Sequence, residues 1–88
     1  MSELTVNPSD VVCTEFDGGD AVLVDLRTKR YYELNETALV IWHGLEEGLR
    51  VDDIVSKVVA VYEVTPVAAR QSVERLISRL QSYRLVTG

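Results

Sequence analysis

The sequence contains a single cysteine, Cys13, and a single histidine, His43, among its 88 residues. One cysteine cannot form an internal disulfide, and together the two residues cannot supply the ligands of a structural zinc site. They also lie in different segments that no motif joins, whereas a catalytic nucleophile needs a base within hydrogen-bond reach. We therefore expect no metal and no catalytic residue, and we interpret Cys13 as a small buried hydrophobic side chain.

Glycine-rich loops and long hydrophobic runs are missing as well. The one pair of adjacent glycines lies in the short run Asp17–Asp20, which is typical of a turn and not of a loop that cradles phosphate. No stretch approaches the ~18 consecutive apolar residues of a membrane helix, and the N-terminus lacks the basic segment of a signal peptide. The sequence thus predicts a cytoplasmic protein that is not an enzyme, has no cofactor and does not contact a membrane.

Positive charge is scarce, with nine Lys and Arg residues against 14 Asp and Glu residues and a net charge of −5. Neutralisation of phosphates by Lys and Arg supplies most of the affinity for nucleic acids, so this balance argues against nucleic-acid binding. The charge is unevenly distributed, however. Residues 66–88 carry four arginines and one glutamate, a local charge of +3, which leaves −8 on residues 1–65. We expect a basic C-terminal segment on an acidic body.

The remaining composition, 47% hydrophobic and 26% charged, is that of an ordinary globular domain. Eighty-eight residues cannot divide their apolar content between two cores, so a single domain is expected over residues 1–88. Alternating side chains predict strands over 11–16, 21–26 and 31–34, separated by polar turns at 17–20 and 27–30. These strands form the first part of the predicted fold.

Helical spacing begins after Asn35, a good N-cap, and predicts a helix over 36–47 with an inward stripe of Ala38, Ile41, Trp42 and Leu45. A second helix is expected from Asp52 to Tyr62, and a third over 66–83, where Thr65 is the N-cap and Pro66 the first helical residue. The fold class is therefore α+β and winged-helix-like, with a three-stranded antiparallel sheet followed by three helices. The inward stripe of the third helix is Ala69, Val73, Leu76, Ile77 and Leu80.

A distinctive run occupies residues 31–38, Tyr-Tyr-Glu-Leu-Asn-Glu-Thr-Ala, and is followed by the Ile41-Trp42 pair. Together with the later landmarks this run resembles the PqqD-like family, whose members are small peptide-recognition domains. The resemblance covers roughly residues 20–86. Residues 26–30 lack the proline of the quinone-pathway members, so the chain is more similar to the stand-alone leader-binding protein of lasso-peptide clusters. The later landmarks are Gly48, Val51–Ile54, Tyr62 and a last helix that leads into Leu85 and Val86.

The resemblance implies that the leader of a ribosomally made precursor peptide adds as a strand to the free edge of strand 31–34. It would pack into the cleft between that strand and the last helix. An unpaired strand edge supports such binding, because its backbone supplies affinity while side-chain pockets supply specificity. By parity Tyr32 shares a face with the buried Leu34. The peptide-binding residues expected on this side are Lys29, Arg30, Tyr31, Tyr32, Glu33 and Leu34.

One flank of the last helix is expected to form the other wall of the cleft. We choose the flank that contains Ile77, because an isoleucine would give the wall an apolar centre for a guest side chain. The opposite flank, with Ser72, Arg75 and Arg79, fits nearly as well and stays open as an alternative. The helix residues assigned to peptide binding are Arg70, Val73, Glu74, Ile77 and Gln81.

The expected partners are the leader peptide together with the leader protease and cyclase of the same pathway, to which the domain would present its substrate. The alternative function is a winged-helix DNA-binding regulator that reads DNA with the arginines of the last helix. The net charge and a hairpin that precedes the helices count against it. Pairing of strand 31–34 with a second copy of the chain is a further possibility compatible with leader binding.

Overall fold

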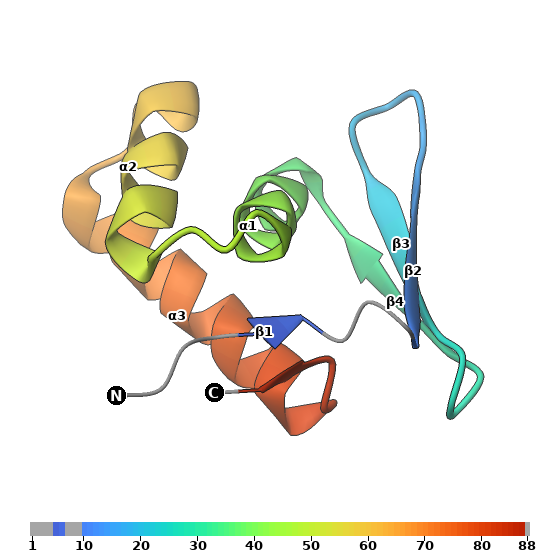
Figure 1. The fold of residues 1–88 in the computed structure, drawn as a ribbon. Coiled ribbons are helices and arrows are strands. Elements are labelled where there is room, and N and C mark those ends of the chain that lie inside the picture. Colours follow the sequence, from blue (N-terminus) through green and yellow to red (C-terminus); the bar gives the residue numbers. More distant parts are fainter. Residues whose placement is uncertain (1–4, 7–9, 88) are drawn as a thin grey trace.

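The computed structural model describes residues 5–6 and 10–87 (Figure 1). Its main sheet has three antiparallel strands, and three helices follow, which confirms the predicted α+β architecture. The predicted bounds agree with the observed ones to within one residue at every helix end. The elements are β1 (Thr5–Val6), β2 (Val11–Glu15), β3 (Ala21–Asp25), β4 (Arg30–Leu34), α1 (Glu36–Glu46), α2 (Val51–Tyr62), α3 (Pro66–Ser82) and β5 (Val86–Thr87).

The main sheet has the order β2-β3-β4, so β3 is central and β4 is an edge strand. Along β3, Ala21, Leu23 and Asp25 are buried, while the two valines between them are half-buried. This alternation turns one face of the sheet toward the helices. The second turn differs slightly from the prediction: Lys29 adopts a positive φ of 62°, which ends the turn and lets β4 begin at Arg30.

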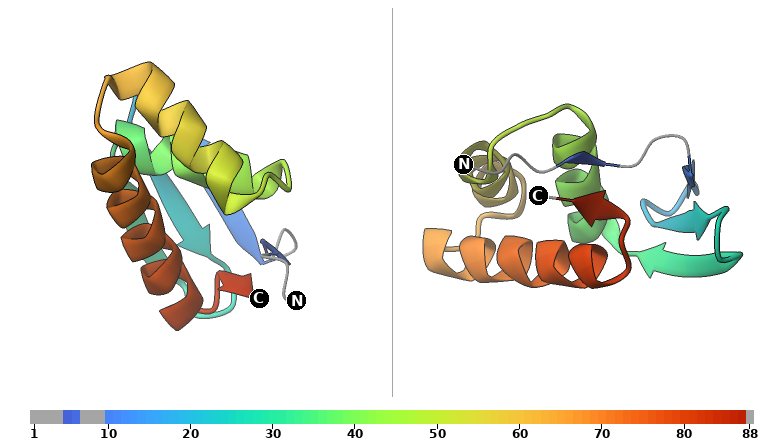
Figure 2. Two further views of the ribbon diagram at one scale, coloured as in Figure 1. Left: turned by 90° about the vertical axis from the view of Figure 1, so that its left-hand side faces the viewer. Right: turned by 60° about the horizontal axis from the view of Figure 1, so that its bottom comes forward.

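A second, smaller sheet pairs β1 with β5 and was not predicted. Val6 lies opposite Val86 in this antiparallel pair. Strands of two residues have no periodic signal in the sequence, which explains why the pairing was missed. Figure 2 shows β5 turning back beside the end of α3. Leu85 and Val86, which follow α3, return onto the core, since both side chains are buried.

Local capping fixes where two of the helices begin. The Asn35 side chain accepts a hydrogen bond from the Ala38 backbone N–H at 2.8 Å, and the Thr65 hydroxyl accepts one from Ala68 at 3.2 Å. Each bond satisfies an N–H that has no partner within its helix. Helix α2 has no such side-chain cap, and it begins at Val51, one residue before the predicted aspartate.

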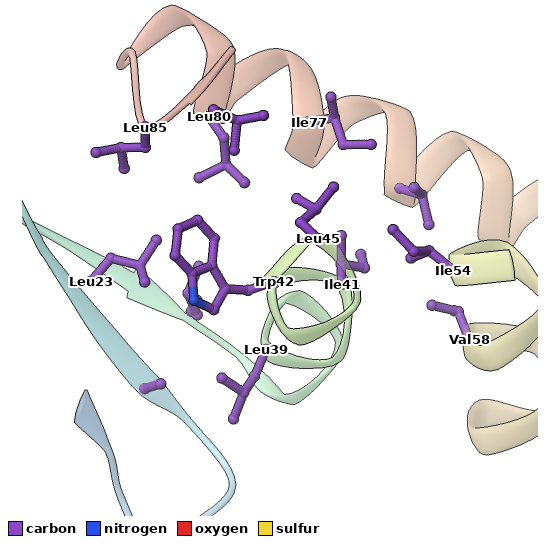
Figure 3. Packing of buried hydrophobic residues seen from close by; sticks show 14 of the residues in the cluster. Leu23, Leu39, Ile41, Trp42, Leu45, Ile54, Val58, Ile77, Leu80 and Leu85 are labelled. Atoms are coloured by element: carbon purple, nitrogen blue, oxygen red, sulfur yellow. The ribbon is translucent and has the colours of Figure 1, made fainter. Parts of the chain in front are cut away.

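The core centres on Trp42 of α1, which is 1% exposed. Figure 3 shows its indole between Leu23 of the sheet and the Leu80 and Leu85 side chains at the end of α3. The other side of α1 packs against α2, which contributes Ile54. Helix α1 is thus the layer that joins the sheet to the other two helices, and Trp42 is the core anchor that the sequence indicated.

Some side chains expected inside are only half-buried. Ala38 and Leu76 are half-buried, and Leu39 takes a buried place on α1 that the prediction did not give it. Cys13, interpreted above as buried, is also half-buried because it lies on an edge strand. Ala38 and Leu76 are important below, because their exposed parts face the same hollow.

One charged side chain lies wholly inside the protein. Asp25 is fully buried at the end of β3 and accepts a hydrogen bond from the Arg27 backbone N–H at 2.9 Å. Burial raises the pKa of this carboxyl, but the hydrogen bonds from Arg27 and the Arg27 charge outweigh it and hold the pKa below its ordinary value. Arg27 also donates to the Arg84 carbonyl at 2.9 Å, so this turn is tied to the end of α3.

We expect Asp25→Asn to lower the free energy of unfolding at neutral pH, because the charged form is the one that its hydrogen bonds favour. A carboxyl with a depressed folded pKa stabilises the fold above its unfolded pKa, and this contribution is lost as pH falls through the folded pKa. Urea unfolding should be measured at stepwise lower pH. The difference in the free energy of unfolding between the variant and the parent protein should become smaller below about pH 3.9, the usual aspartate pKa. An undiminished difference at low pH would contradict this explanation.

Candidate functional site

The hydrogen bonds of the first hairpin show to which neighbouring strand each residue of β3 bonds through its backbone. The backbone N–H of Leu26 donates to Asp10 at 2.7 Å, and that of Phe16 donates to Asp20 at 2.9 Å. Both pairs lie in the register that joins β2 to β3. Bonded and non-bonded pairs alternate in an antiparallel ladder, so the even-numbered residues of β3 bond to β2 and the odd-numbered residues bond to β4.

The same alternation identifies the free backbone groups of β4. The odd-numbered residues of β3 lie opposite Arg30, Tyr32 and Leu34, which are therefore the residues bonded to β3. Tyr31 and Glu33 direct their N–H and C=O groups to the other side. No strand of the described residues pairs with β4 on that side. The open edge thus offers the backbone groups of two residues to a further strand.

Two adjoining hollows lie beside α3. The smaller one is lined by β4, the start of α1 and α3, and the larger one by the start of α1 and α3. The larger has a volume of about 240 Å³ and the smaller one of about 90 Å³. Asn35, Ala38, Leu76 and Arg79 line both, so we treat the two as one feature, the β4–α3 groove. The right-hand view of Figure 2 shows β4 and the last turns of α3 at the same level, with α1 above them.

The two hollows differ in their remaining lining. The smaller hollow adds tyrosine and leucine side chains and the charged Glu33, and the larger one adds mainly polar side chains. The smaller hollow adds Tyr32, Glu33, Leu34, Leu80 and Tyr83, and the larger adds Thr37, Ile41, Ser72 and Arg75.

An aromatic pair lines the smaller hollow of the groove. The rings of Tyr32 on β4 and Tyr83 after α3 stack with centroids 4.3 Å apart and an interplanar angle of 21°. Offset aromatic pairs of this kind contribute about 0.5–1.5 kcal/mol beyond their buried area. The stack therefore helps to hold the end of α3 at a fixed distance from β4. Nothing in the sequence pattern pointed to Tyr83.

The structure brings together half of the site residues expected on the strand side. Tyr32, Glu33 and Leu34 line the smaller hollow next to α3. Lys29, Arg30 and Tyr31 lie outside both hollows, and Tyr31 is 72% exposed on the opposite face of the sheet. Tyr31 remains a candidate through its backbone groups on the open edge.

The helix residues assigned to peptide binding lie away from the groove. Val73 and Ile77 are buried in the core, so Ile77 does not present an apolar surface to a guest. Arg70 forms an ion pair with Asp52 of α2 and lies 4.0 Å from Glu74, on the side of α3 that faces α2. Gln81 is exposed and lines neither hollow.

The groove is lined instead by the flank that the sequence left open as an alternative. Ser72, Arg75 and Arg79 line it, and Leu76 supplies the apolar centre that we expected from Ile77. Which of these side chains touches a peptide stays a prediction. The location of the groove, however, favours Leu76 over Ile77.

Groups with reactive chemistry gather where the last turn of α1 meets the edge strand β2, on the helix-facing side of the sheet. His43 lies 3.1 Å from Glu15 and 3.1 Å from Glu46. Burial, and then the charges of Glu46 and Glu15, raise the pKa of the Cys13 thiol, which disfavours the reactive thiolate. Among residues 5–6 and 10–87, no group of three or more His, Cys, Asp or Glu side chains is arranged to hold a metal ion.

None of the helices in the described part of the chain combines the length and apolar character needed to cross a membrane.

The fold and groove define a winged-helix-like α+β domain with an open strand edge beside a cleft. The family described as "Coenzyme PQQ synthesis protein D (PqqD)" matches residues 20–86, and the chain belongs to this family. The resemblance noted from the Tyr31–Trp42 region is thereby confirmed. A search of the curated proteins finds no match.

Two solved structures share the fold over nearly the whole chain. One is described as "TbiB1 in Complex with the TbiA(beta) Leader Peptide"; it is 28% identical, with a TM-score of 0.86 over 96% of this chain and 95% of that one. The other is described as "Lasso peptide synthetase B1 complexed with the leader peptide"; it is 26% identical, with a TM-score of 0.85 over 99% of this chain and 100% of that one. Both proteins were captured with a leader peptide.

Proposed function

We propose that this domain binds the leader segment of a ribosomally made precursor peptide, of the lasso-peptide kind, as an added strand on β4. The observation that carries the proposal is the open edge at Tyr31 and Glu33 next to a groove on the helix side. The two similar structures, both complexes with leader peptides, support it. The whole of residues 1–88 would act as one leader-binding domain.

Strand addition divides the binding energy between backbone and side chains. Guest hydrogen bonds to the edge are independent of sequence, whereas every second guest side chain enters the groove and is selected there. The five residues of β4 extend over roughly 17 Å, which corresponds to about five guest residues. The groove therefore contacts only a short part of a leader and leaves the remainder of the precursor free.

The smaller hollow suits an apolar guest side chain. Leu34 and Leu80 are buried at its base, and the stacked Tyr32 and Tyr83 rings enclose it. The half-buried Leu76 forms the wall on α3. Burying a leucine-sized guest side chain here would contribute about 1.5–3 kcal/mol, which is enough to discriminate against a polar residue.

The proposed role is one of delivery and not of catalysis. Holding the leader would raise the effective concentration of the precursor at a leader protease and a cyclase that bind it weakly alone. Because the precursor is made on ribosomes, the encounter belongs in the cytoplasm. Mixing the purified partners with and without this domain tests delivery, since protease cleavage at sub-saturating precursor should be faster with it.

We expect the leader of the nearest encoded precursor peptide to shift backbone amide NMR signals in residues 30–34 and 72–83. Shifts confined to these two segments would match an added strand beside the groove. Duplex DNA of random sequence is the control for the alternative function. Shifts of Arg75 and Arg79 with DNA, and none with the leader, would replace this proposal with a DNA-binding regulator.

A further inference from the structure

The larger hollow contains an unusual pair of charges. Arg75 and Arg79 lie four residues apart on α3, and both line this hollow. Like charges at this spacing destabilise a helix by a few tenths of a kcal/mol. Within the described residues neither arginine has an acidic partner within 4.0 Å, whereas Arg27 and Arg70 both do. The pair is therefore a concentration of positive charge that the described residues do not neutralise.

The rest of the larger hollow combines polar and apolar groups. Asn35, Thr37 and Ser72 provide hydrogen-bonding groups, and Ile41 and Leu76 provide apolar surface. A glutamate or aspartate side chain matches this combination, because its methylene groups can pack on the apolar part while the carboxylate meets the guanidinium groups. Arginine is well suited to this contact, since its planar fork matches both oxygens of a carboxylate.

The two hollows adjoin each other, which relates the charge of the larger one to a bound peptide. Side chains two residues apart in an extended guest lie on the same face, about 6.6 Å apart. The hollows share four lining residues, so neighbouring side chains on one face of a guest could enter both. An apolar residue would occupy the smaller hollow and an acidic residue, two positions along, the larger.

We propose that Arg75 and Arg79 make the groove selective for a leader with an acidic side chain two positions from an apolar one. This inference rests on the proposed function and deepens it, because it assigns a chemical class to one leader position. The pair acts as a specificity determinant within the binding site. A leader without the acid would still add to the β4 edge, but it would bind more weakly.

The test exchanges the charges of the two partners and measures binding by calorimetry, with the leader of the nearest encoded precursor peptide. The double variant Arg75→Glu/Arg79→Glu should bind this leader about 10- to 100-fold more weakly than the parent. Replacing each acidic leader residue by lysine in turn should identify one position with a similar loss. At that position, the lysine leader and the double variant should recover binding when they are combined.

A matched control is available on the same helix. Arg70→Glu makes the same change of charge as each single replacement in the double variant, but Arg70 pairs with Asp52 and lies off the groove. It should bind the leader with an affinity close to that of the parent. A loss at Arg70 equal to that of the double variant would mean that general charge attraction is at work, and would overturn the inference.

The remaining outcomes separate this inference from the function on which it depends. If the parent binds the leader and the double variant binds it equally well, the inference is wrong while leader binding stands. If the parent does not bind the leader at all, the proposed function fails first. If the parent binds duplex DNA and the double variant does not, the arginine pair contacts phosphate, and the inference is also overturned.

Discussion

Replacing Glu33 by proline is expected to weaken leader binding by at least tenfold while leaving the fold intact. The N–H of Glu33 points out of the open edge of β4 and is not part of the ladder with β3. Proline removes this donor and places its ring where a guest strand would approach, yet proline is tolerated on an edge strand whose N–H faces outward. One lost hydrogen bond of about 0.5–1.5 kcal/mol, added to the steric conflict, accounts for the expected tenfold.

Two further variants make this test specific for the backbone. Glu33→Ala removes the same side chain but keeps the N–H, so it should retain most of the affinity. Tyr32→Pro interrupts the bonding to β3 and should destabilise the fold, because proline removes a ladder hydrogen bond there. Calorimetry measures the leader affinity of the three variants, and circular dichroism shows whether each of them is folded. Undiminished affinity in a folded Glu33→Pro protein would rule out strand addition at this edge.

Most of the secondary structure could be predicted because its signals are local. Asn35 and the Thr65-Pro66 pair fix two helix starts through bonds to residues three positions away. The strands of the main sheet are long enough to show alternation. The β1–β5 pairing joins residues about 80 positions apart through two-residue strands, and no local pattern encodes it.

The choice of helix flank could not be made from the sequence, and the reason is geometric. Leu76 and Ile77 are adjacent apolar residues on α3, about 100° apart around the helix axis. Spacing alone places both near the core stripe. Which one is buried depends on the rotation of α3 against α1 and β4, which the packing decides. Here Ile77 is buried at 7% exposure, and Leu76 is left at the groove.

The aromatic pair illustrates the same limit. Tyr32 was expected to share a face with Leu34, and its half-buried position on the helix side agrees with that parity. Its stacking partner, Tyr83, follows α3 at a place where the chain turns back. Only the tertiary structure brings these residues together, so no periodicity could have paired them.

The largest expected effect on stability comes from Trp42→Ala. Trp42 is 1% exposed and lies where α1 meets both the sheet and the end of α3 (Figure 3). Removing a buried aromatic ring typically costs about 3–5 kcal/mol, because contacts are lost and a cavity remains. Small domains have a total stability of only about 5–15 kcal/mol, so this variant should be marginally folded at best. Urea unfolding measures the loss directly.

The comparison with Trp42→Phe separates ring packing from the indole N–H. The Nε1 atom of Trp42 is buried and has no hydrogen-bond partner among the described residues. Phenylalanine keeps an aromatic ring and eliminates this unsatisfied donor, whose burial costs free energy. Trp42→Phe should therefore lose clearly less stability than Trp42→Ala. The control is Val67→Ala, which changes a side chain that is 69% exposed and should lose almost no stability. Equal losses in both Trp42 variants would mean that the indole is held by an interaction other than packing. Because α1 also lines the groove through Ala38 and Ile41, the unfolding of Trp42→Ala should abolish leader binding in parallel.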